Sequence, residues 1–227
     1  MPSLTQVNHS PPVEHALKKM LEAISGGPLP EWNRVQSALQ VRSLQVGETV
    51  FLQGREHTFV YAVRSGLLKF SYVSEDGDEW IKSFAYEGRF FGSLAALEPD
   101  GRTSYTVTAL EPCTVEQLDY RVLTTLAATH LPWSRALHGL ILGISARREQ
   151  RELELRTLGP EQRYIAFKNA YPGLERRVTQ KDLARHLSLT PVGLNRIVMR
   201  VRRRLNGQGP DQAASGLGTP SRTEKMR

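Results

Sequence analysis

The spacing of the apolar residues changes from a helical period to a period of two and back again, which constrains the fold more than any other feature of this chain. Between Gln40 and Leu118, short runs rich in β-branched and aromatic residues are separated by glycine, a pattern typical of strands joined by turns. The runs cover residues 41–44, 49–53, 59–64, 67–73, 79–86, 104–110 and 114–118. Asp76-Gly77 lies between two of them and predicts a tight hairpin. Many short strands at regular spacing predict a sandwich or jelly-roll barrel.

Helical periods flank this β-rich region on both sides. On the N-terminal side, residues 13–25 predict an amphipathic helix, and a second short helix is expected over residues 32–39. The apolar face of the first helix consists of Val13, Ala16, Leu17, Met20, Leu21 and Ile24. Residues 1–12 are polar, contain paired prolines and are predicted to be disordered.

A long helix is predicted on the C-terminal side of the barrel. Asp119 is placed to cap a helix that ends near Thr129, and Pro132 opens a longer helix over residues 132–158. Within it, the four-three-four spacing of a coiled-coil seam occurs at Trp133, Leu137, Leu140 and Ile144. This seam favours a homodimer. The alternative, a helix packed on its own barrel, stays open.

The segment Val178–Arg204 has the layout of two short helices around a tight turn. Thr179 is a candidate N-cap of the first helix, and Thr190 can cap a second helix that begins at Pro191. One apolar stripe runs along each helix, made of Leu183, Ala184 and Leu187, then Leu194, Ile197, Val198 and Val201. This layout predicts a helix-turn-helix, whose second helix enters a major groove of DNA. A surface helical hairpin with a solvated basic face is the alternative.

Polar and basic residues occupy the other side of the second helix. Asn195 and Arg196 are of the types that read adenine and guanine edges by paired hydrogen bonds. The arginines from Arg200 to Arg204 suit phosphates, which give affinity without sequence information. Residues 160–204 contain eleven Lys/Arg and three Asp/Glu, so the net charge of +7 is concentrated in this segment. A localised basic patch is the electrostatic signature of a nucleic-acid-binding surface.

The order of barrel, long helix and helix-turn-helix resembles the bacterial transcription regulators typified by the cyclic-AMP receptor protein and the fumarate–nitrate reduction regulator. The segments that carry the resemblance are VTQKDLARHLSLTPVGLNRI and, more loosely, VGETVFLQG and FFGSLAAL. It implies an α+β chain: a cyclic-nucleotide-binding-like β jelly-roll barrel with flanking helices in residues 13–131, a dimerisation helix in 132–158, and a helix-turn-helix domain in 159–205. That domain would be winged-helix-like with a reduced wing. Residues 206–227 are rich in Gly, Ser and Pro and are predicted to be disordered.

By position, the resemblance implies that Pro191, Val192 and Arg196 lie where the family's recognition helix touches bases. Thr179 and Gln180 would lie where the first helix meets the DNA backbone. The residues expected to bind DNA are Thr179, Gln180, Thr190, Pro191, Val192, Asn195, Arg196, Arg200, Arg202 and Arg203. The expected partners are double-stranded DNA, a second copy of the chain, and RNA polymerase.

A small-molecule effector site is implied at Gly92, Ser93, Leu94, Arg102, Thr103 and Ser104. In the cyclic-nucleotide binders that this chain resembles, a Gly-Glu-Leu turn and a later Arg-Ser pair hold the ribose and the cyclic phosphate. Here Ser93 replaces the glutamate and Arg102 lies one residue early, so cyclic AMP is not expected. A different effector or none is expected, and Arg102 either neutralises another anion or lies in a solvated loop.

Several other classes of protein are disfavoured. The single cysteine, Cys113, excludes an intramolecular disulfide framework and an iron–sulfur cluster, and it fits the reducing cytoplasm. No apolar run reaches the roughly 18 residues that a membrane span requires. His57 is the only histidine in the β-rich region, whereas a cupin-type metal site needs several. We expect no catalytic residue, metal or cofactor. Two alternatives to a DNA-binding regulator stay open: a small-molecule sensor that signals through protein contacts, and a metal-dependent barrel enzyme.

Overall fold

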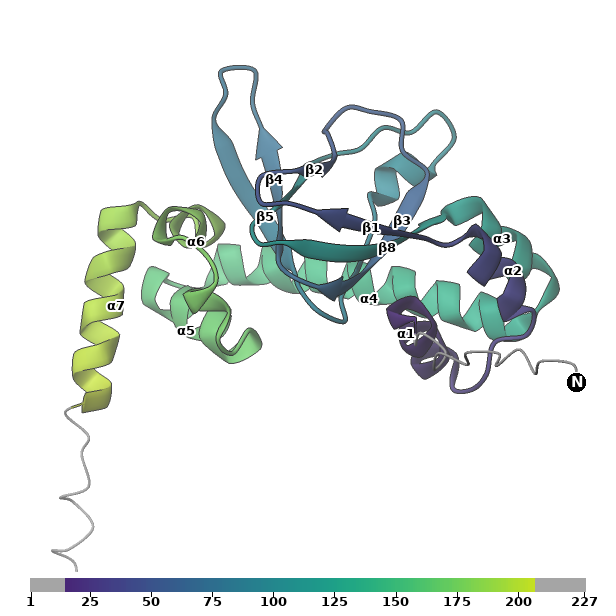
Figure 1. The fold of residues 1–227 in the computed structure, drawn as a ribbon. Coiled ribbons are helices and arrows are strands. Elements are labelled where there is room, and N and C mark those ends of the chain that lie inside the picture. Colours follow the sequence, from purple (N-terminus) through teal and green to yellow (C-terminus); the bar gives the residue numbers. More distant parts are fainter. Residues whose placement is uncertain (1–14, 207–227) are drawn as a thin grey trace, which may run out of the picture.

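The structure is a computed structural model that describes residues 15–206. A β-barrel lies along a long helix, and a helical unit follows at the far end of that helix (Figure 1). The α+β class and this order of elements confirm the prediction from the sequence. The expected disorder of residues 1–12 and 206–227 and the expected reduced wing concern residues outside the described range, apart from Asn206, which ends the last helix.

The barrel consists of two antiparallel four-stranded sheets. The first sheet contains, in spatial order, β1 (Gln40–Leu44), β8 (Cys113–Asp119), β3 (Phe59–Ser65) and β6 (Phe90–Phe91). The second contains β2 (Thr49–Phe51), β7 (Thr106–Ala109), β4 (Leu68–Val73) and β5 (Glu79–Ala85). All seven expected runs form strands, and the β4–β5 hairpin turns at Gly77, whose φ of 83° favours glycine. Strand β6 was not predicted, because a strand of two residues is too short to show alternating apolar and polar positions.

An apolar core fills the space between the two sheets. Tyr61 and Val63 of β3 point into it from the first sheet, and Val107 of β7 meets them from the second. All three side chains are fully buried. Alternate residues of a strand point to the same side, and the other side of β3 is also buried, because Val60 and Ala62 pack in the cluster that contains residues of α1 and α3.

Seven α-helices accompany the barrel within the described residues. They are α1 (Ala16–Ser25), α2 (Trp32–Ala38), α3 (Tyr120–Thr129), α4 (Leu131–Thr157), α5 (Pro160–Ala170), α6 (Gln180–His186) and α7 (Pro191–Asn206). Short 3-10 helices span Leu94–Leu97 and Leu174–Arg176. The Asp119 carboxylate accepts the backbone N–H of Arg121 at 2.9 Å, which confirms it as the cap of α3.

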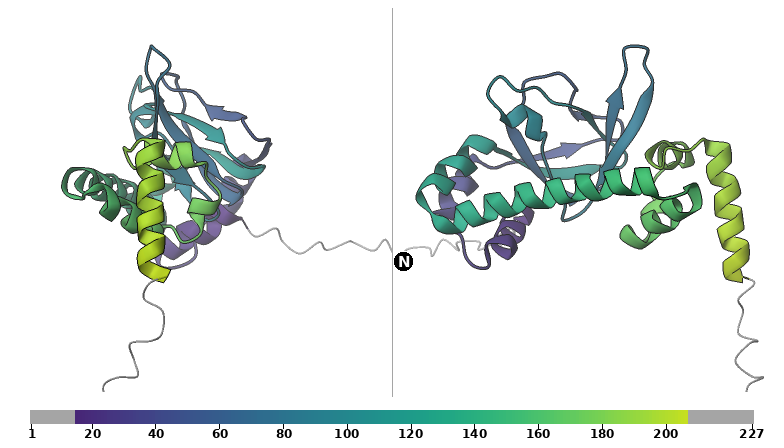
Figure 2. Two further views of the ribbon diagram at one scale, coloured as in Figure 1. Left: turned by 90° about the vertical axis from the view of Figure 1, so that its left-hand side faces the viewer. Right: turned by 180° about the vertical axis from the view of Figure 1, so that it is seen from behind.

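Helix α4 runs along the barrel, and α1 and α3 pack against its N-terminal half (Figure 2). Trp133 and Leu140 are only 1% and 6% exposed, and the Trp133 indole N–H donates to the Pro30 carbonyl at 2.7 Å. The prediction that these two residues face a second copy of the chain is therefore wrong, because their stripe is buried within the chain itself. Leu142 and Leu153 lie on another side of α4 and are 54% and 53% exposed.

The helices α5–α7 and the barrel share one apolar cluster. Leu67, Ile81 and Phe84 of the barrel belong to it together with Phe167 of α5 and Leu183 of α6. These helices are thus packed onto the barrel as well as joined to it through α4. This contact could not be predicted from the sequence, because each side has the apolar pattern of an ordinary core-facing stripe of its own element.

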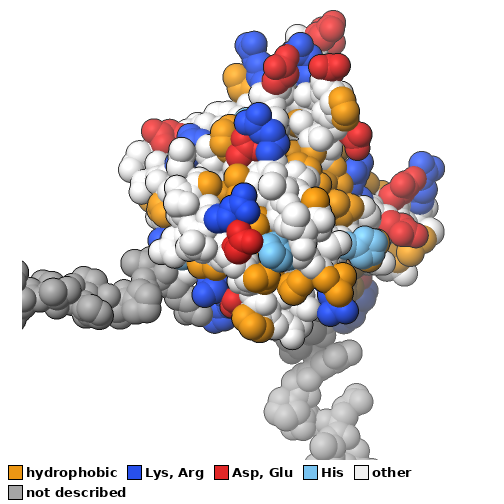
Figure 3. Space-filling model, turned by 90° about the vertical axis from the view of Figure 1, so that its right-hand side faces the viewer, with side chains coloured by type: hydrophobic (Ala, Val, Ile, Leu, Met, Phe, Trp, Pro, Cys, Tyr) orange, Lys and Arg blue, Asp and Glu red, His pale blue; other side chains and the backbone are white. Residues whose placement is uncertain are grey.

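The two ends of the molecule differ in surface character. At the end formed by α2 and α3, apolar side chains are interspersed with both signs of charge (Figure 3). The opposite end is formed by α7 (Figure 1). The arginines Arg196, Arg200, Arg202 and Arg203 of this helix are exposed. In residues 15–206 no helix has both the length and the apolar character needed to cross a membrane.

Candidate nucleic-acid interface and effector pocket

Side-chain caps fix the start of both helices in the C-terminal pair. The Thr179 hydroxyl accepts the backbone N–H of Asp182 at 3.0 Å, and the Thr190 hydroxyl accepts that of Gly193 at 3.0 Å. Each bond satisfies a backbone donor that the first turn of a helix leaves without a partner. Ser188 takes a left-handed conformation in the turn between the helices, with φ 55°. Both predicted caps are confirmed.

Apolar packing then sets which side of α7 faces outward. Leu183 of α6 and Leu187, which directly follows α6, are buried with Leu194 of α7, and the stripe continues through Ile197 and Val201. Because this stripe is fixed inward, the residues between its members are turned to solvent. The predicted apolar stripes are confirmed.

The outward side of α7 carries the residues expected to read bases. Pro191, Val192, Asn195 and Arg196 are exposed in the first turns of the helix, and no described element covers that side (Figure 2). Thr179, Gln180 and Thr190 are also exposed at the starts of the two helices. The structure therefore presents all of these residues to solvent on the same helix pair.

The arginines further along α7, which were expected to bind phosphates, fall into two groups. Arg200 and Arg204 both reach Glu161 at the start of α5, at 3.3 and 2.8 Å. Arg202 and Arg203 are exposed and form no ion pair within residues 15–206. Sequence reasoning missed Glu161, which lies 39 residues before Arg200 and shows no local sign of the pairing.

Ion pairs attach the helix pair to the barrel. The Arg177 guanidinium bonds both carboxylate oxygens of Glu87, at 2.9 and 3.0 Å, and both of Glu111, at 3.0 and 2.6 Å. These hydrogen bonds from Arg177 lower the pKa of Glu87 to about 2. On α6, Arg185 pairs with Glu79 of β5 at 2.7 Å. Planar guanidinium groups suit such two-oxygen contacts, which fix orientation as well as distance.

His186, at the end of α6, is buried in this contact. Its Nδ1 lies 3.4 Å from the Ile81 carbonyl, and its ring packs against Phe84 and Phe167. Burial, followed by the charge of Arg151, lowers the pKa of His186 to about 3, so the ring is neutral at physiological pH. The guanidinium of Arg151, on α4, donates to the backbone carbonyl of His186.

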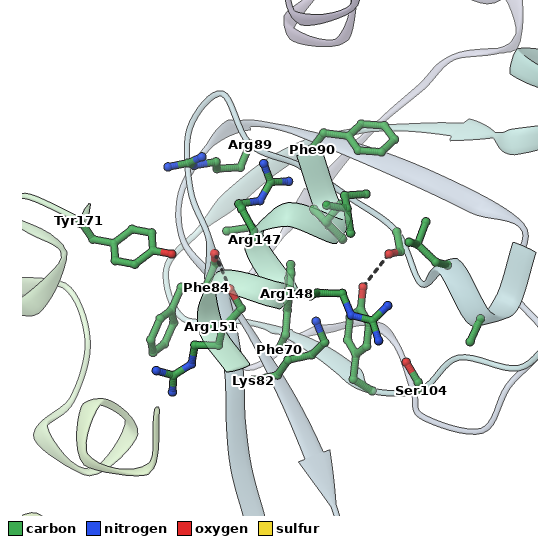
Figure 4. Close-up of a pocket in the computed structure, with 18 residues that line it drawn as sticks. Phe70, Lys82, Phe84, Arg89, Phe90, Ser104, Arg147, Arg148, Arg151 and Tyr171 are labelled. Atoms are coloured by element: carbon green, nitrogen blue, oxygen red, sulfur yellow. Dashed lines mark hydrogen bonds between the residues drawn. The ribbon is translucent and has the colours of Figure 1, made fainter. Parts of the chain in front are cut away.

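A pocket with a volume of about 220 Å³ lies between the barrel and α4 (Figure 4). Three of the residues expected to bind an effector line it: Gly92, Leu94 and Ser104. Ser93 and Thr103 do not. Ser93 is buried and its hydroxyl accepts the Ser104 backbone N–H at 3.2 Å, while the Thr103 hydroxyl bonds the backbone of the β2–β3 loop.

Arg102 also lies outside the pocket. Its guanidinium donates to the Gly54 carbonyl at 3.1 Å and lies 3.5 Å from Glu56, and its side chain is 61% exposed. Of the two possibilities left open by the sequence, this position corresponds to the solvated loop. Arg102, which lies one residue before the arginine position of the cyclic-nucleotide binders, is thus directed at another part of the barrel surface.

Cations from other elements line the pocket instead. Lys82 comes from β5, Arg89 precedes β6, and Arg147, Arg148 and Arg151 come from α4 (Figure 4). The sequence offered one signal for this set: the apolar pattern of the long helix turns basic after Ile144, which also lines the pocket. It offered none for Lys82.

The remaining reactive groups form no site. Cys113 is buried, burial raises the pKa of its thiol, and its Sγ lies 3.4 Å from the Leu67 carbonyl. Across residues 15–206, no three His, Cys, Asp or Glu side chains gather closely enough to hold a metal ion.

Known proteins resemble this chain in both sequence and fold. Residues 41–130 match the cyclic nucleotide-binding domain family. The chain is 26% identical over 170 residues to the fumarate and nitrate reduction regulatory protein of Vibrio cholerae, covering 70% of this chain and 67% of that protein. With the Escherichia coli K12 protein of the same name the identity is 27%, over the same shares.

Among solved structures, FixK2 from Bradyrhizobium japonicum is similar, with a TM-score of 0.65 and 18% identity over 73% of this chain and 85% of that one. A cyclic nucleotide-binding domain containing protein from Listeria monocytogenes has a TM-score of 0.60 and 14% identity over 84% and 92% of the two chains. At these identities the two structures establish a shared fold.

Proposed function

We propose that the chain is a sequence-specific DNA-binding regulator of the family of transcription regulators typified by the cyclic-AMP receptor protein and the fumarate and nitrate reduction regulator. Helix α7 is the recognition helix of this proposal. One observation carries the proposal. Asn195 and Arg196 are exposed in the first turns of α7, and the opposite side of this helix is buried in an apolar cluster. A rigid helix with exposed N-terminal turns fits a major groove.

The proposed contacts divide into two kinds. Asn195 and Arg196 would read base edges, with Pro191 and Val192 close to the same groove. The exposed hydroxyl and amide groups of Thr179, Gln180 and Thr190 and the charges of Arg200, Arg202 and Arg203 would bind phosphates. Phosphate contacts position the protein on the duplex, whereas base contacts select the sequence.

The proposed regulator is a homodimer that binds a palindromic operator. Leu131, Leu142 and Leu153 support this, because they are exposed on α4 at intervals of eleven residues, about three helical turns, and so lie on one side of the helix. Exposed leucines in a row indicate a surface that another apolar surface covers. A two-fold pair would place its recognition helices about 34 Å apart, one turn of DNA.

We further propose that cyclic AMP is not the effector. Ser93 stands where the cyclic-nucleotide binders have the glutamate that accepts the ribose hydroxyl. The Ser93 hydroxyl accepts the backbone N–H of Ser104 instead. Arg102 points outside the pocket. RNA polymerase remains a partner expected for a cytoplasmic regulator of this kind.

Selection of bound sequences from random duplex DNA tests the proposal, followed by titration of the selected duplex with an Arg196→Ala variant. We expect this variant to bind about 5–150-fold more weakly, a loss of about 1–3 kcal/mol, and to tolerate substitution at one base pair. Arg55→Ala is the matched control, because it removes one exposed arginine from the barrel, and it should bind like the wild type.

Two other functions remain distinguishable from this one. A sensor that signals only through protein contacts would yield no enriched sequence in the selection. A role as an enzyme is not proposed, since the relatives in sequence are regulators.

A further inference from the structure

We propose that the pocket between the barrel and α4 binds a small anion with a planar apolar body, and that Lys82 and Arg148 hold its anionic group. This goes beyond DNA binding and does not depend on it. The ligand class follows from the charge of the lining, the lack of acidic partners, and the shape of the apolar walls.

The charge of the lining is entirely positive. Five Lys/Arg side chains line the pocket, and no aspartate or glutamate of residues 15–206 lines it. Arg89 and Arg151 have hydrogen-bond acceptors, the Tyr86 hydroxyl at 2.6 Å and the His186 carbonyl respectively. The side chains of Lys82, Arg147 and Arg148 form neither a hydrogen bond nor an ion pair with any other residue in the range 15–206.

These three cations contrast with the other basic residues near the barrel. Lys69, Arg64 and Arg177 each lie within 2.6 Å of a carboxylate oxygen. The chain therefore supplies acidic partners on the barrel surface but not in this pocket. Concentrated positive charge inside a concave, partly apolar site attracts an anion more strongly than the same charge on an open surface.

Lys82 is the most constrained of the set. It is half-buried, and its Nζ lies 4.8 Å from the ring centroid of Tyr105. Burial, then the charges of Arg148 and Arg147, lower the pKa of Lys82 to about 8. An anion placed between Lys82 and Arg148 would relieve this like-charge repulsion.

The apolar walls are aromatic and flat. Phe70 stacks on Tyr105 with ring centroids 5.3 Å apart and an angle of 27° between the rings, and Phe91 lies 5.2 Å from Phe70. Tyr105 is anchored by its hydroxyl, which donates to the Gly92 carbonyl at 2.8 Å. Such walls suit a planar body, and a volume of about 220 Å³ limits the ligand to metabolite size.

The position of the charge separates this site from a cyclic-nucleotide site. The positive groups lie on β5 and α4, whereas Arg102 is turned toward Gly54 and Glu56. A ligand held from β5 and α4 need not carry a ribose or a cyclic phosphate. Carboxylates and phosphate monoesters share the required chemistry, and the test below separates them.

Calorimetric titration of the full chain with simple probes tests the proposal. 1-Naphthyl phosphate and 1-naphthylacetate carry both features, 1-naphthalenemethanol carries only the apolar body, and inorganic phosphate carries only the charge. We expect at least one of the first two to bind about tenfold more tightly than either single-feature probe. The tighter of the two identifies the anionic group, and cyclic AMP is titrated alongside them.

Variants then locate the ligand. Lys82→Met and Arg148→Gln should each weaken binding of the tighter probe about tenfold or more, and Arg148→Lys should recover part of the loss. Arg102→Ala is the control, since it removes an arginine outside the pocket, and it should bind like the wild type. Thermal melts confirm that each variant is folded.

Four results would overturn the proposal. The first two are no binding of either complete probe and equal binding of the neutral probe. The others are a loss with Arg102→Ala as large as with Arg148→Gln, and tighter binding of cyclic AMP than of both naphthyl anions. The titrations contain no DNA, so their failure leaves the DNA-binding proposal intact, and failure of the DNA selection leaves this one intact.

Discussion

Two groups of cations in this molecule have opposite surroundings. Arg196, Arg202 and Arg203 stand on the convex outer side of α7. Lys82 and Arg148 line a concave pocket between the barrel and α4. The same kinds of side chain thus suit different anions: a convex basic helix fits the long polyanion of a DNA groove, whereas a concave basic pocket with aromatic walls fits one small anion.

The difference also lies in what supports each group. The α7 arginines depend on one apolar stripe that turns them outward, and the pocket cations depend on two elements that are brought together by the packing of α4 on the barrel. Damage to one support should therefore leave the other group largely in place. Four changes test whether this distinction holds.

The largest effect is expected from Leu194→Ala. Leu194 is fully buried between α6 and α7, so the cavity should lower the free energy of unfolding by about 2–5 kcal/mol and weaken DNA binding to every sequence alike. Urea unfolding measures the loss. Val192→Ala, at a 63% exposed position on the same helix, should change stability by less than about 0.5 kcal/mol. Equal effects of the two variants would contradict the packing described here.

The next effect concerns pH, through His186 at the junction of the helix pair and the barrel. Its folded pKa of about 3 lies below the ordinary value of 6.5, so the unfolded chain binds the proton more readily. The stability contributed by the neutral ring is complete above pH 6.5 and is lost as the pH falls toward 3. Between pH 7 and 4.5 the loss should be about 2–3 kcal/mol.

Urea unfolding at the two pH values, with His186→Gln as the comparison, isolates this contribution from that of the carboxylates. The variant should lose less stability than the wild type on acidification. An identical loss in both proteins would show that His186 is not held neutral by burial.

Arg151 contacts both regions, and Arg151→Ala is expected to have a smaller effect, on the coupling between ligand binding and DNA binding. Arg151 lines the pocket and also donates to the His186 carbonyl at the end of α6. We expect a bound naphthyl anion to change the DNA affinity of the wild type by up to about tenfold, and of this variant by less than about twofold. Anisotropy titrations with and without the probe measure the ratio. A ratio unchanged by the substitution would exclude Arg151 as the link.

The smallest effect is expected from Glu161→Gln. This change releases Arg200 and Arg204 from their shared carboxylate, so affinity for nonspecific DNA should rise about threefold and its salt dependence should steepen. Glu152→Gln breaks a comparable exposed pair with Arg156 on α4 and serves as the control. Similar shifts in both variants would mean that only total charge matters.

The sequence predicted the helix pair residue by residue because all of its determinants are local. Thr179 and Thr190 are residue types that favour the N-cap position, and the spacing of Leu194 and Ile197 determines which side of α7 is buried. Once that side is known, the exposure of Arg196 follows from helical geometry alone. The seven longer strands were predictable for the same reason.

The pocket could not be predicted in this way. Lys82 and Arg148 are far apart in sequence and meet only because α4 lies along the barrel, and no periodicity records that placement. Local pattern also left Arg102 undecided, since the direction of a loop side chain depends on its neighbours Gly54 and Glu56. The stripe at Trp133 and Leu140 showed correctly that one side of α4 is buried but not which surface covers it.

The most direct test of the two-site account is a single anisotropy titration of the selected operator, at one salt concentration and without added ligand, for three proteins. Relative to the wild type, Arg196→Ala should bind about 5–150-fold more weakly, and Arg148→Gln should bind within about twofold, although each variant removes one positive charge. Equal losses in the two variants, or an undiminished affinity for Arg196→Ala, would contradict the assignment of α7 to DNA and of the pocket to a separate anion.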